Sequence, residues 1–190
     1  MTSPTPPTDK HQTGLTQVYA ELLAQFRDRP VSLLEIGIAQ GGSLFFWAEF
    51  FTNPATRILG LDLQPPDCVY PANVQAIACD QNDAARLRQL ATAHGPFDLI
   101  IDDASHFTKE TRICFHTLFP AFLKVGGWYI IEDWAVGYWK DKDPRYRGMV
   151  ELITEIITQA PTLSISEFRL SLKTGQAYAA FRKGEKGWQF

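Results

Sequence analysis

Two apolar segments of this chain each end in a pair of carboxylates. Residues 97–101 have the pattern of a buried strand and lead into Asp102 and Asp103, and residues 128–131 lead into Glu132 and Asp133. Carboxylates gathered at neighbouring strand ends repel one another and lose hydration, so they require a cation or bound protons. Ligands that are all oxygen favour a hard cation, Mg²⁺ or Ca²⁺, over zinc. The two pairs together predict a metal-assisted active site, although one pair alone is more often ordinary capping or a solvated acid at a strand end.

A histidine follows the first pair at short range. His106 lies three residues beyond Asp103, in the turn after the strand. A neutral imidazole there can take the proton of a substrate hydroxyl, which a bound metal would acidify. We therefore predict that His106 lies on the rim of the same crevice and acts as a general base. His94 and His116 are given no role.

A glycine-containing turn marks a second candidate site. An apolar strand over residues 31–37 leads into Gly37, Gly41 and Gly42, and Asp62 ends the next strand twenty residues later. Glycines at a strand-to-helix turn let the backbone approach a ligand, and an acid at that distance can accept both ribose hydroxyls of a nucleotide. Nicotinamide-binding and S-adenosylmethionine-binding folds share this pattern.

Two details favour S-adenosylmethionine. Glu35 lies inside the strand, where a nicotinamide fingerprint has an apolar residue, and Ala39 replaces the middle glycine of GxGxxG. Glu35 can orient the loop or meet the amino group of a methionine moiety, or it simply caps local amides. Asp80 and Gln81 end a third strand, where an Asp can accept from an adenine amine or cap the next helix.

Strands and helices alternate along the rest of the chain, which is typical of a parallel sheet covered on both faces. We expect an α/β, Rossmann-like fold with a seven-stranded, mostly parallel sheet, a C-terminal antiparallel strand and helices on both faces. Residues 1–8 are predicted to be disordered and residues 9–190 to form one domain. The expected strands are 31–37, 57–63, 74–80, 97–103 and 128–133, with a closing antiparallel pair at 163–172 and 176–183. The expected helices are 15–26, 43–51 capped by Ser43, 82–93, 108–123 stopped by Gly126 and Gly127, and 146–159.

Composition narrows the class of protein. The 190 residues carry a net charge of −3 with no basic block, which argues against nucleic-acid binding by bulk electrostatics. Three cysteines without a CxxC spacing fit a reducing compartment, and neither a signal peptide nor a run long enough to cross a bilayer is present. We therefore predict a cytoplasmic protein that binds neither nucleic acid nor membrane.

Taken together, these stretches resemble a known family. They are TDKH (8–11), LLEIGIAQGGSL (33–44), GLDL (60–63), CDQ (79–81), IIDDASH (100–106) and GGWYIIEDW (126–134). The chain resembles the class I S-adenosylmethionine-dependent methyltransferases, and most of all the metal-dependent sugar O-methyltransferases of macrolide biosynthesis, the mycinamicin and demethylmacrocin type. The glycine loop is general to the superfamily, whereas the DDASH and IIEDW stretches together are much more specific.

The resemblance implies roles for named residues. Asp103, Glu132 and Asp133 would hold Mg²⁺, with His106 and Asp103 as the catalytic pair, and the TDKH segment would fold over the cofactor. The S-adenosylmethionine site would draw on Lys10, Glu35, Gly37, Ala39, Gly41, Ser43, Asp62, Leu63, Asp80, Gln81 and Asp102. The partner would be a small-molecule acceptor with a hydroxyl group, a sugar or another natural product, and the chain could form a homo-oligomer. The macrolide enzymes carry an additional N-terminal domain that is not represented in these residues, so the acceptor stays open.

Two other functions are compatible with parts of the sequence. A nicotinamide-dependent oxidoreductase would use Asp62 but leaves Glu35 and the second carboxylate pair without a role. A non-catalytic protein could keep the nucleotide pocket alone. The aromatic segment 134–139, WAVGYW, follows the second carboxylate pair and would form either a platform for the acceptor or ordinary packing under a loop.

Overall fold

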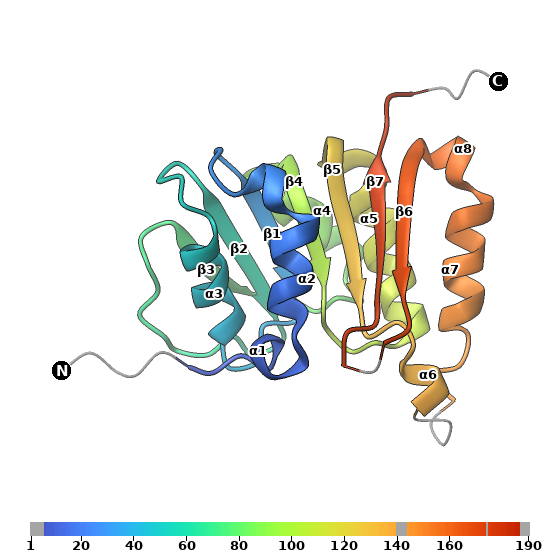
Figure 1. Ribbon diagram of the computed structural model, residues 1–190, viewed down its shortest axis with the longest axis horizontal. Helices are drawn as coiled ribbons and strands as arrows, with labels where there is room; N and C mark the ends of the chain where they lie inside the picture. Colours follow the sequence, from blue (N-terminus) through green and yellow to red (C-terminus); the bar gives the residue numbers. More distant parts are fainter. Residues whose placement is uncertain (1–5, 140–143, 174, 187–190) are drawn as a thin grey trace.

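The computed structural model describes residues 6–139, 144–173 and 175–186. Its centre is one seven-stranded sheet in the order β3-β2-β1-β4-β5-β7-β6 (Figure 1). The strands are β1 (Ser32–Ile36), β2 (Arg57–Asp62), β3 (Val74–Ala78), β4 (Phe97–Asp102), β5 (Leu123–Glu132), β6 (Ile165–Ser171) and β7 (Tyr178–Lys183). Strand β7 is antiparallel to both neighbours and the remaining pairs are parallel. The predicted sheet, including its closing antiparallel pair, is confirmed.

Helices cover both faces of this sheet, as predicted. One face packs against α2 (Leu15–Leu22), the 3₁₀ turn η1 (Ala24–Phe26) and α3 (Gly42–Phe50). The opposite face packs against α4 (Ala84–His94), α5 (Thr108–Phe122) and α7 (Met149–Thr158). Three one-turn helices complete the fold: α1 (Lys10–Thr13), α6 (Val136–Trp139) and α8 (Ala160–Leu163).

The central strands read as unbroken apolar runs because both of their faces are buried. Successive residues of a strand point to opposite sides, so Leu33 packs with Trp47 and Trp128 on the α2–α3 face. Leu34, its neighbour in the chain, packs with Phe115 and Phe119 on the α5 face. Two separate cores therefore hold the sheet between its helical layers.

The boundary between α5 and β5 differs from the prediction. Gly126 and Gly127 do not end the helix, because α5 already ends at Phe122 and the chain enters β5 directly at Leu123. The pairing of β4 with β5 is irregular between Phe97 and Leu99, and both glycines lie within that stretch of β5. A Cβ on Gly127 would lie 2.5 Å from the carbonyl oxygen of Asp98, so this residue permits the close strand contact.

The carboxyl ends of the parallel strands share one edge of the sheet, where α1 and α6 also lie (Figure 1, lower edge). Residues 6–13, here called the N-terminal strap, run along this edge and include α1. Residues 1–5 lie outside the described part, so disorder over residues 1–8 and a single domain over 9–190 stay predictions. Among the described residues, no helix is long and apolar enough to cross a membrane.

Candidate active site

The turn after β1 brings the backbone of two strand ends into contact. Gly37 has φ +85°, and its amide donates to the carbonyl oxygen of Leu61 at 2.8 Å. A Cβ at this position would lie 2.3 Å from the carbonyl oxygen of Asp103. Only glycine suits both the left-handed conformation and the missing space. Gly37 therefore allows the turn after β1 to lie against the backbone of Asp103, the second residue of the first carboxylate pair.

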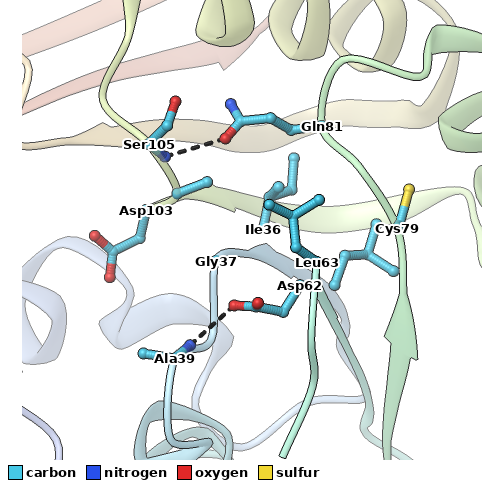
Figure 2. A pocket seen from close by; sticks show the side chains of 11 residues that line it. Ile36, Gly37, Ala39, Asp62, Leu63, Cys79, Gln81, Asp103 and Ser105 are labelled. Atoms are coloured by element: carbon cyan, nitrogen blue, oxygen red, sulfur yellow. Dashed lines mark hydrogen bonds between the residues drawn. The ribbon is translucent and has the colours of Figure 1, made fainter.

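Asp62 fixes the shape of this turn from the end of β2. Its Oδ2 accepts from the amides of Ile38 and Ala39 at 3.0 and 3.1 Å, and its Oδ1 accepts from the amide of Gln64 at 3.0 Å. Figure 2 shows the hydrogen bond from Ala39. A carboxylate has about four acceptor positions. Asp62 therefore keeps acceptor capacity for a ligand while it holds the loop.

A pocket of about 270 Å³ opens between these strand ends (Figure 2). Its lining includes Gly37, Ala39, Asp62, Leu63, Cys79, Gln81, Asp103 and Ser105. The Oε1 of Gln81 accepts from the amide of Ser105 at 3.0 Å, which fixes the orientation of the side-chain amide. Its Nε2 is buried and has no hydrogen-bond partner among the described residues. A buried donor of this kind lacks a partner that a bound ligand can supply.

A second pocket, of about 380 Å³, shares Gly37, Ala39, Asp103 and Ala104 with the first. The strap contributes Pro7, Thr8, Asp9 and Lys10 to its wall, and His106 and Ser43 also line it. Three residues of the TDKH segment, Thr8, Asp9 and Lys10, thus line this pocket, and the prediction that the segment covers the cofactor stays a prediction. The two pockets form one cleft along the carboxyl edge, with Asp103 at their junction.

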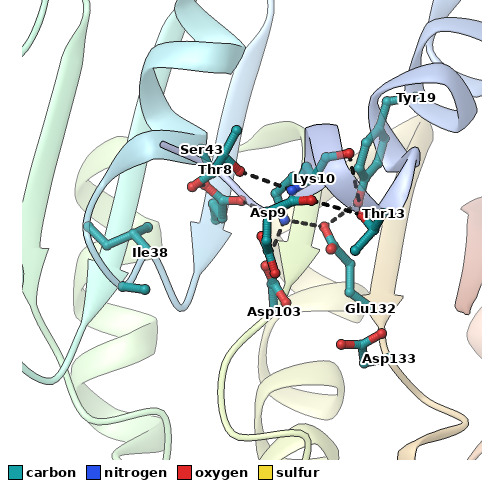
Figure 3. Close-up of polar contacts among 12 residues, drawn as sticks. Thr8, Asp9, Lys10, Thr13, Tyr19, Ile38, Ser43, Asp103, Glu132 and Asp133 are labelled. Carbon is teal, nitrogen blue, oxygen red and sulfur yellow. Dashed lines mark hydrogen bonds and ion pairs between the residues drawn. The ribbon is translucent and has the colours of Figure 1, made fainter. Parts of the chain in front are cut away.

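Three carboxyl groups, those of Glu35, Asp103 and Glu132, surround the ammonium of Lys10 in this cleft, and Figure 3 shows the contacts with Asp103 and Glu132. The Nζ of Lys10 lies 2.6 Å from Asp103 Oδ2, 2.7 Å from Glu132 Oε1 and 3.5 Å from Glu35 Oε1. The hydroxyl of Tyr19 also donates to Glu132 Oε1. Glu35, Glu132 and Lys10 are almost fully buried. We call Lys10, Glu35, Asp103 and Glu132 the carboxylate cluster.

Burial and charge act in opposite directions on this cluster. Desolvation raises the pKa of Asp103 to about 6 and that of Glu132 to about 7, although the Lys10 ammonium lowers both. Desolvation also raises the pKa of Glu35. Burial alone would lower the pKa of Lys10, but the charges of Asp103, Glu132 and Glu35 raise it well above its ordinary value. Three carboxyl groups around one ammonium leave an excess of negative charge that protons or a further cation must balance.

The donor set is suited to a cation. One carboxylate oxygen from each of Glu35, Asp103 and Glu132 lies within 4.8 Å of the others. The Lys10 ammonium itself occupies the position of a cation between the oxygens of Asp103 and Glu132. The residues present therefore fit a hard cation, but the set differs from the predicted one. Glu35 belongs to it in the structure, whereas Asp133 lies apart (Figure 3).

Asp133 lies beside His106 instead. The Nε2 of His106 is 3.9 Å from Asp133 Oδ2, and both side chains are partly exposed. Of the four non-glycine residues with positive φ among those described, Ala39 (43°) and His106 (57°) line the cleft, and Asp133 (50°) lies beside His106. Non-glycine residues rarely adopt this conformation, and they gather at functional sites. This strain supports a functional role for the rim that His106 and Asp133 form.

Four predicted cofactor residues lie outside both pockets, and one of them, Glu35, belongs to the carboxylate cluster. Asp102 points to the α5 face, where it accepts from the Tyr129 hydroxyl at 3.0 Å and where burial raises its pKa to about 7. The Oδ1 of Asp80 accepts from the amide of Asn82 at 2.8 Å, within the turn before α4. Gly41 is the N-cap of α3, and the space beside it holds the Tyr70 hydroxyl.

The remaining difference concerns Ser43, which was predicted to cap α3. It lies within the first turn of that helix, and its hydroxyl donates to Glu35 Oε2 at 2.6 Å. Its contribution is thus to hold Glu35. Sequence reasoning missed Tyr19 altogether, although a Tyr in the apolar stripe of a buried helix is a signal, because its hydroxyl requires a partner.

Comparisons with known proteins relate this chain to methyltransferases. No family model matches the chain. The chain is 38% identical over 140 residues to the 8-demethyl-8-alpha-L-rhamnosyl tetracenomycin-C 2'-O-methyltransferase of Streptomyces olivaceus, which covers 70% of this chain and 35% of the relative. It is 38% identical over 148 residues to the demethylmacrocin O-methyltransferase of Streptomyces fradiae, 72% of this chain and 37% of the relative. The chain thus spans about a third of the length of these curated relatives.

A solved structure extends the likeness to the fold. The MycE methyltransferase of the mycinamycin biosynthetic pathway, solved in complex with Mg and SAH, superposes with a TM-score of 0.77 at 29% identity. The match covers 95% of this chain and 56% of MycE. The fold described above is therefore the class I methyltransferase fold, in agreement with the prediction.

Proposed function

We propose that this chain is an S-adenosylmethionine-dependent O-methyltransferase. It has the class I methyltransferase fold, and its sequence is similar to those of sugar O-methyltransferases of macrolide and tetracenomycin biosynthesis. Its acceptor is a hydroxyl of a small molecule, a sugar or another natural product. One observation carries the proposal. The nucleotide-type pocket and the carboxylate cluster adjoin, and Asp103 belongs to both.

The first pocket would hold the nucleoside of the cofactor. Asp62 keeps acceptor capacity for ribose hydroxyls, and the unpaired Nε2 of Gln81 would donate to the adenine ring. The second pocket, between Gly37 and the strap, would hold the methionine end. This assignment places the methyl group near Asp103, where the two pockets meet.

The cluster would hold Mg²⁺ through Asp103 and Glu132, and Glu35 is the third carboxylate of this donor set in the structure. Asp133, the third ligand that we predict from the sequence, lies outside the set and beside His106. When bound, the ion would supply Lewis-acid chemistry that lowers the pKa of the acceptor hydroxyl. His106 lines the second pocket and would take the hydroxyl proton. Asp133, whose carboxylate lies 3.9 Å from His106 Nε2, would orient the imidazole and stabilise its protonated form.

The other two functions considered from the sequence receive no support from the relatives. The two curated relatives described above are both named as O-methyltransferases, and neither is named as a nicotinamide-dependent enzyme. Whether the chain assembles with copies of itself, and whether its location is cytoplasmic, remain predictions. The cysteines Cys68, Cys79 and Cys114 are free, in keeping with a reducing compartment.

Calorimetric titration of S-adenosylhomocysteine into the protein, with Mg²⁺ and then with EDTA, tests the cofactor assignment. We expect binding in both conditions. Asp62→Ala should weaken binding about tenfold to a hundredfold, because charge-assisted hydrogen bonds are lost. Asp67→Ala removes an exposed acid from the same loop, outside both pockets, and should leave binding unchanged. No binding by the unaltered protein, or equal effects of the two substitutions, would contradict the proposal.

Methyl transfer to demethylmacrocin and to simpler glycosides, followed by mass spectrometry, tests the reaction. EDTA should abolish transfer. His106→Ala should lower kcat about 10²- to 10⁴-fold without changing the affinity for S-adenosylhomocysteine. His94→Ala, a histidine on α4 outside both pockets, is the matched control and should retain full activity. Equal rates for the two variants would remove His106 from the mechanism.

A further inference from the structure

The cation site of the carboxylate cluster is filled by a side chain of the same protein. Lys10 reaches down from the strap, and its Nζ lies 2.6 Å from Asp103 Oδ2 and 2.7 Å from Glu132 Oε1 (Figure 3). The lysine is 1% exposed. A lysine is almost never buried to this degree unless carboxylates pair with its charge. The cluster and the strap are therefore joined through one ammonium group.

We propose that Lys10 is a tethered cation that a divalent metal ion displaces, so that metal binding releases the N-terminal strap from the cleft. This inference rests on the proposed metal site at Asp103 and Glu132. It adds that Lys10 competes with the metal ion for this site, and that metal binding changes the position of the strap. Lys10 acts here as a positioning residue for the strap.

The first step of the argument is competition for the same oxygen atoms. Mg²⁺ binds carboxylate oxygens at about 2.0–2.1 Å and requires a nearly ideal octahedron around it. The ammonium already lies between one oxygen of Asp103 and one of Glu132, within hydrogen-bond distance of both. A metal ion bound to those two oxygens would occupy the same space and repel the ammonium. Metal and ammonium therefore exclude each other in this arrangement.

The second step concerns the fate of the displaced ammonium. Without its carboxylate partners, a buried ammonium would be strongly destabilised, so it must move to water. Lys10 is the first residue of α1, a single helical turn without a side-chain cap. An isolated turn of this length has little stability of its own. When Lys10 leaves the cluster, we therefore expect α1 to move with it.

The third step concerns the other contacts that hold the strap against the rest of the protein. The carbonyl oxygen of Thr13 accepts from Gln176 Nε2 at 2.8 Å, and the His11 ring packs edge-on against Phe46. The backbone of Pro7 lies directly on Gly42. These contacts are peripheral, whereas Lys10 is the buried anchor of the strap. Since residues 7–10 wall the second pocket, releasing the strap would open this pocket.

The proposal can be tested without turnover. Mn²⁺, which replaces Mg²⁺ in a site of this type, is titrated into the unaltered protein and into Lys10→Met, and bound Mn²⁺ is measured by electron paramagnetic resonance. Hydrogen exchange of the backbone amides of residues 8–14 is followed with and without the ion. Lys124→Met is the matched control, since it also removes a lysine that pairs with an aspartate at 2.7 Å, Asp98, outside both pockets.

In the unaltered protein, Mn²⁺ should accelerate exchange over residues 8–14 at least tenfold. Lys10→Met should bind Mn²⁺ about tenfold more tightly, and its strap should exchange rapidly whether or not the ion is present. Lys124→Met should match the unaltered protein in both measurements. The exchange data keep the test independent of the variant, in case Lys10→Met folds poorly.

The opposite outcomes separate this inference from the proposed function. Slower exchange of the strap on adding Mn²⁺, or unchanged affinity in Lys10→Met, would mean that lysine and metal bind together and would overturn the displacement while leaving the metal site. Failure of both proteins to bind Mn²⁺ would overturn the displacement and the metal site together. Binding of S-adenosylhomocysteine, measured on the same samples, would still report on the cofactor pocket.

Discussion

Replacing Gly37 by alanine should damage the fold and the cofactor site together, for two additive reasons. The residue has φ +85°, where an L-residue is destabilised by about 1–2 kcal/mol. The added Cβ would also lie 2.3 Å from Asp103 O and 2.5 Å from Ala104 Cα, both backbone atoms that no side-chain rotation can move aside. Crowding of this kind costs about 1–3 kcal/mol more. We expect Gly37→Ala to lower the free energy of unfolding by about 2–5 kcal/mol.

The chain contains a control for the first reason alone. Gly126 has φ +79°, but a Cβ there would have no atom within 4 Å. Gly126→Ala should therefore show only the conformational cost, about 1–2 kcal/mol, and normal cofactor binding. Relief of the clash at Gly37 requires the tips of β1 and β4 to separate by roughly 1 Å, and both pockets include these tips. Since displacements of about 1 Å can cost 10²-fold in function, binding of S-adenosylhomocysteine should weaken at least tenfold.

Urea denaturation gives the free energies of unfolding, and calorimetry gives the affinities. The informative quantity is the difference between the two variants, because the conformational cost is common to both. Equal destabilisation by Gly37→Ala and Gly126→Ala, with unchanged affinity in both, would refute the reasoning. It would mean that the tips of β1 and β4 are not in contact, and that the proposed junction of the two pockets is misplaced.

Three further substitutions test other parts of the structure. Because burial raises the pKa of Asp102 to about 7, the fold favours its protonated form, and the stability it contributes is lost as pH rises from about 4, the ordinary pKa of an aspartate, to about 7. Asp102→Asn should flatten that loss, which is about 4 kcal/mol at most, without changing cofactor affinity; an unchanged pH profile would mean that Asp102 is not buried as described. Lys183→Met removes an ammonium that donates to the carbonyl oxygens of Phe119, Pro120 and Leu123, so it should lower thermal stability by about 1–3 kcal/mol, whereas no change would show that water replaces the lysine. Ser43→Ala deprives the buried Glu35 of its 2.6 Å donor and should cost about 1.5–3 kcal/mol, and a neutral result would show that another donor reaches Glu35.

The sheet could be predicted from the sequence because its signals are local. Each parallel strand is a short apolar run ended by a turn residue, and helical periodicity separates one strand from the next. The start of β5 could not be predicted in this way. Gly126 and Gly127 resemble a helix stop, but they serve the irregular pairing of β5 with β4, which depends on strand register. Register is a property of two distant segments and leaves no mark in either segment alone.

The location of the site was predictable for a related reason, and its inner arrangement was not. Residues at the carboxyl ends of neighbouring parallel strands must share an edge, so the two acid pairs had to meet. Alternation along β4 meant that Asp102 and Asp103 could not both face the cleft. The pairing of Asp102 with Ile36, which packs on the α5 face, decides which one does. That decision requires the three-dimensional register.

The carboxylate cluster is a feature that the sequence predicts in part and that the three-dimensional structure completes. Glu35 inside an apolar strand and Tyr19 inside an apolar helical stripe are polar groups that burial leaves in need of partners. The sequence thus predicts that partners exist, but it does not identify them. Lys10 meets the need from 93 residues away from Asp103 and 122 away from Glu132, in a one-turn helix whose neighbouring polar residues Asp9, His11 and Gln12 are exposed. A buried charge in such an exposed segment is therefore better evidence of a site than any local pattern in that segment, because the oppositely charged cluster makes its burial possible.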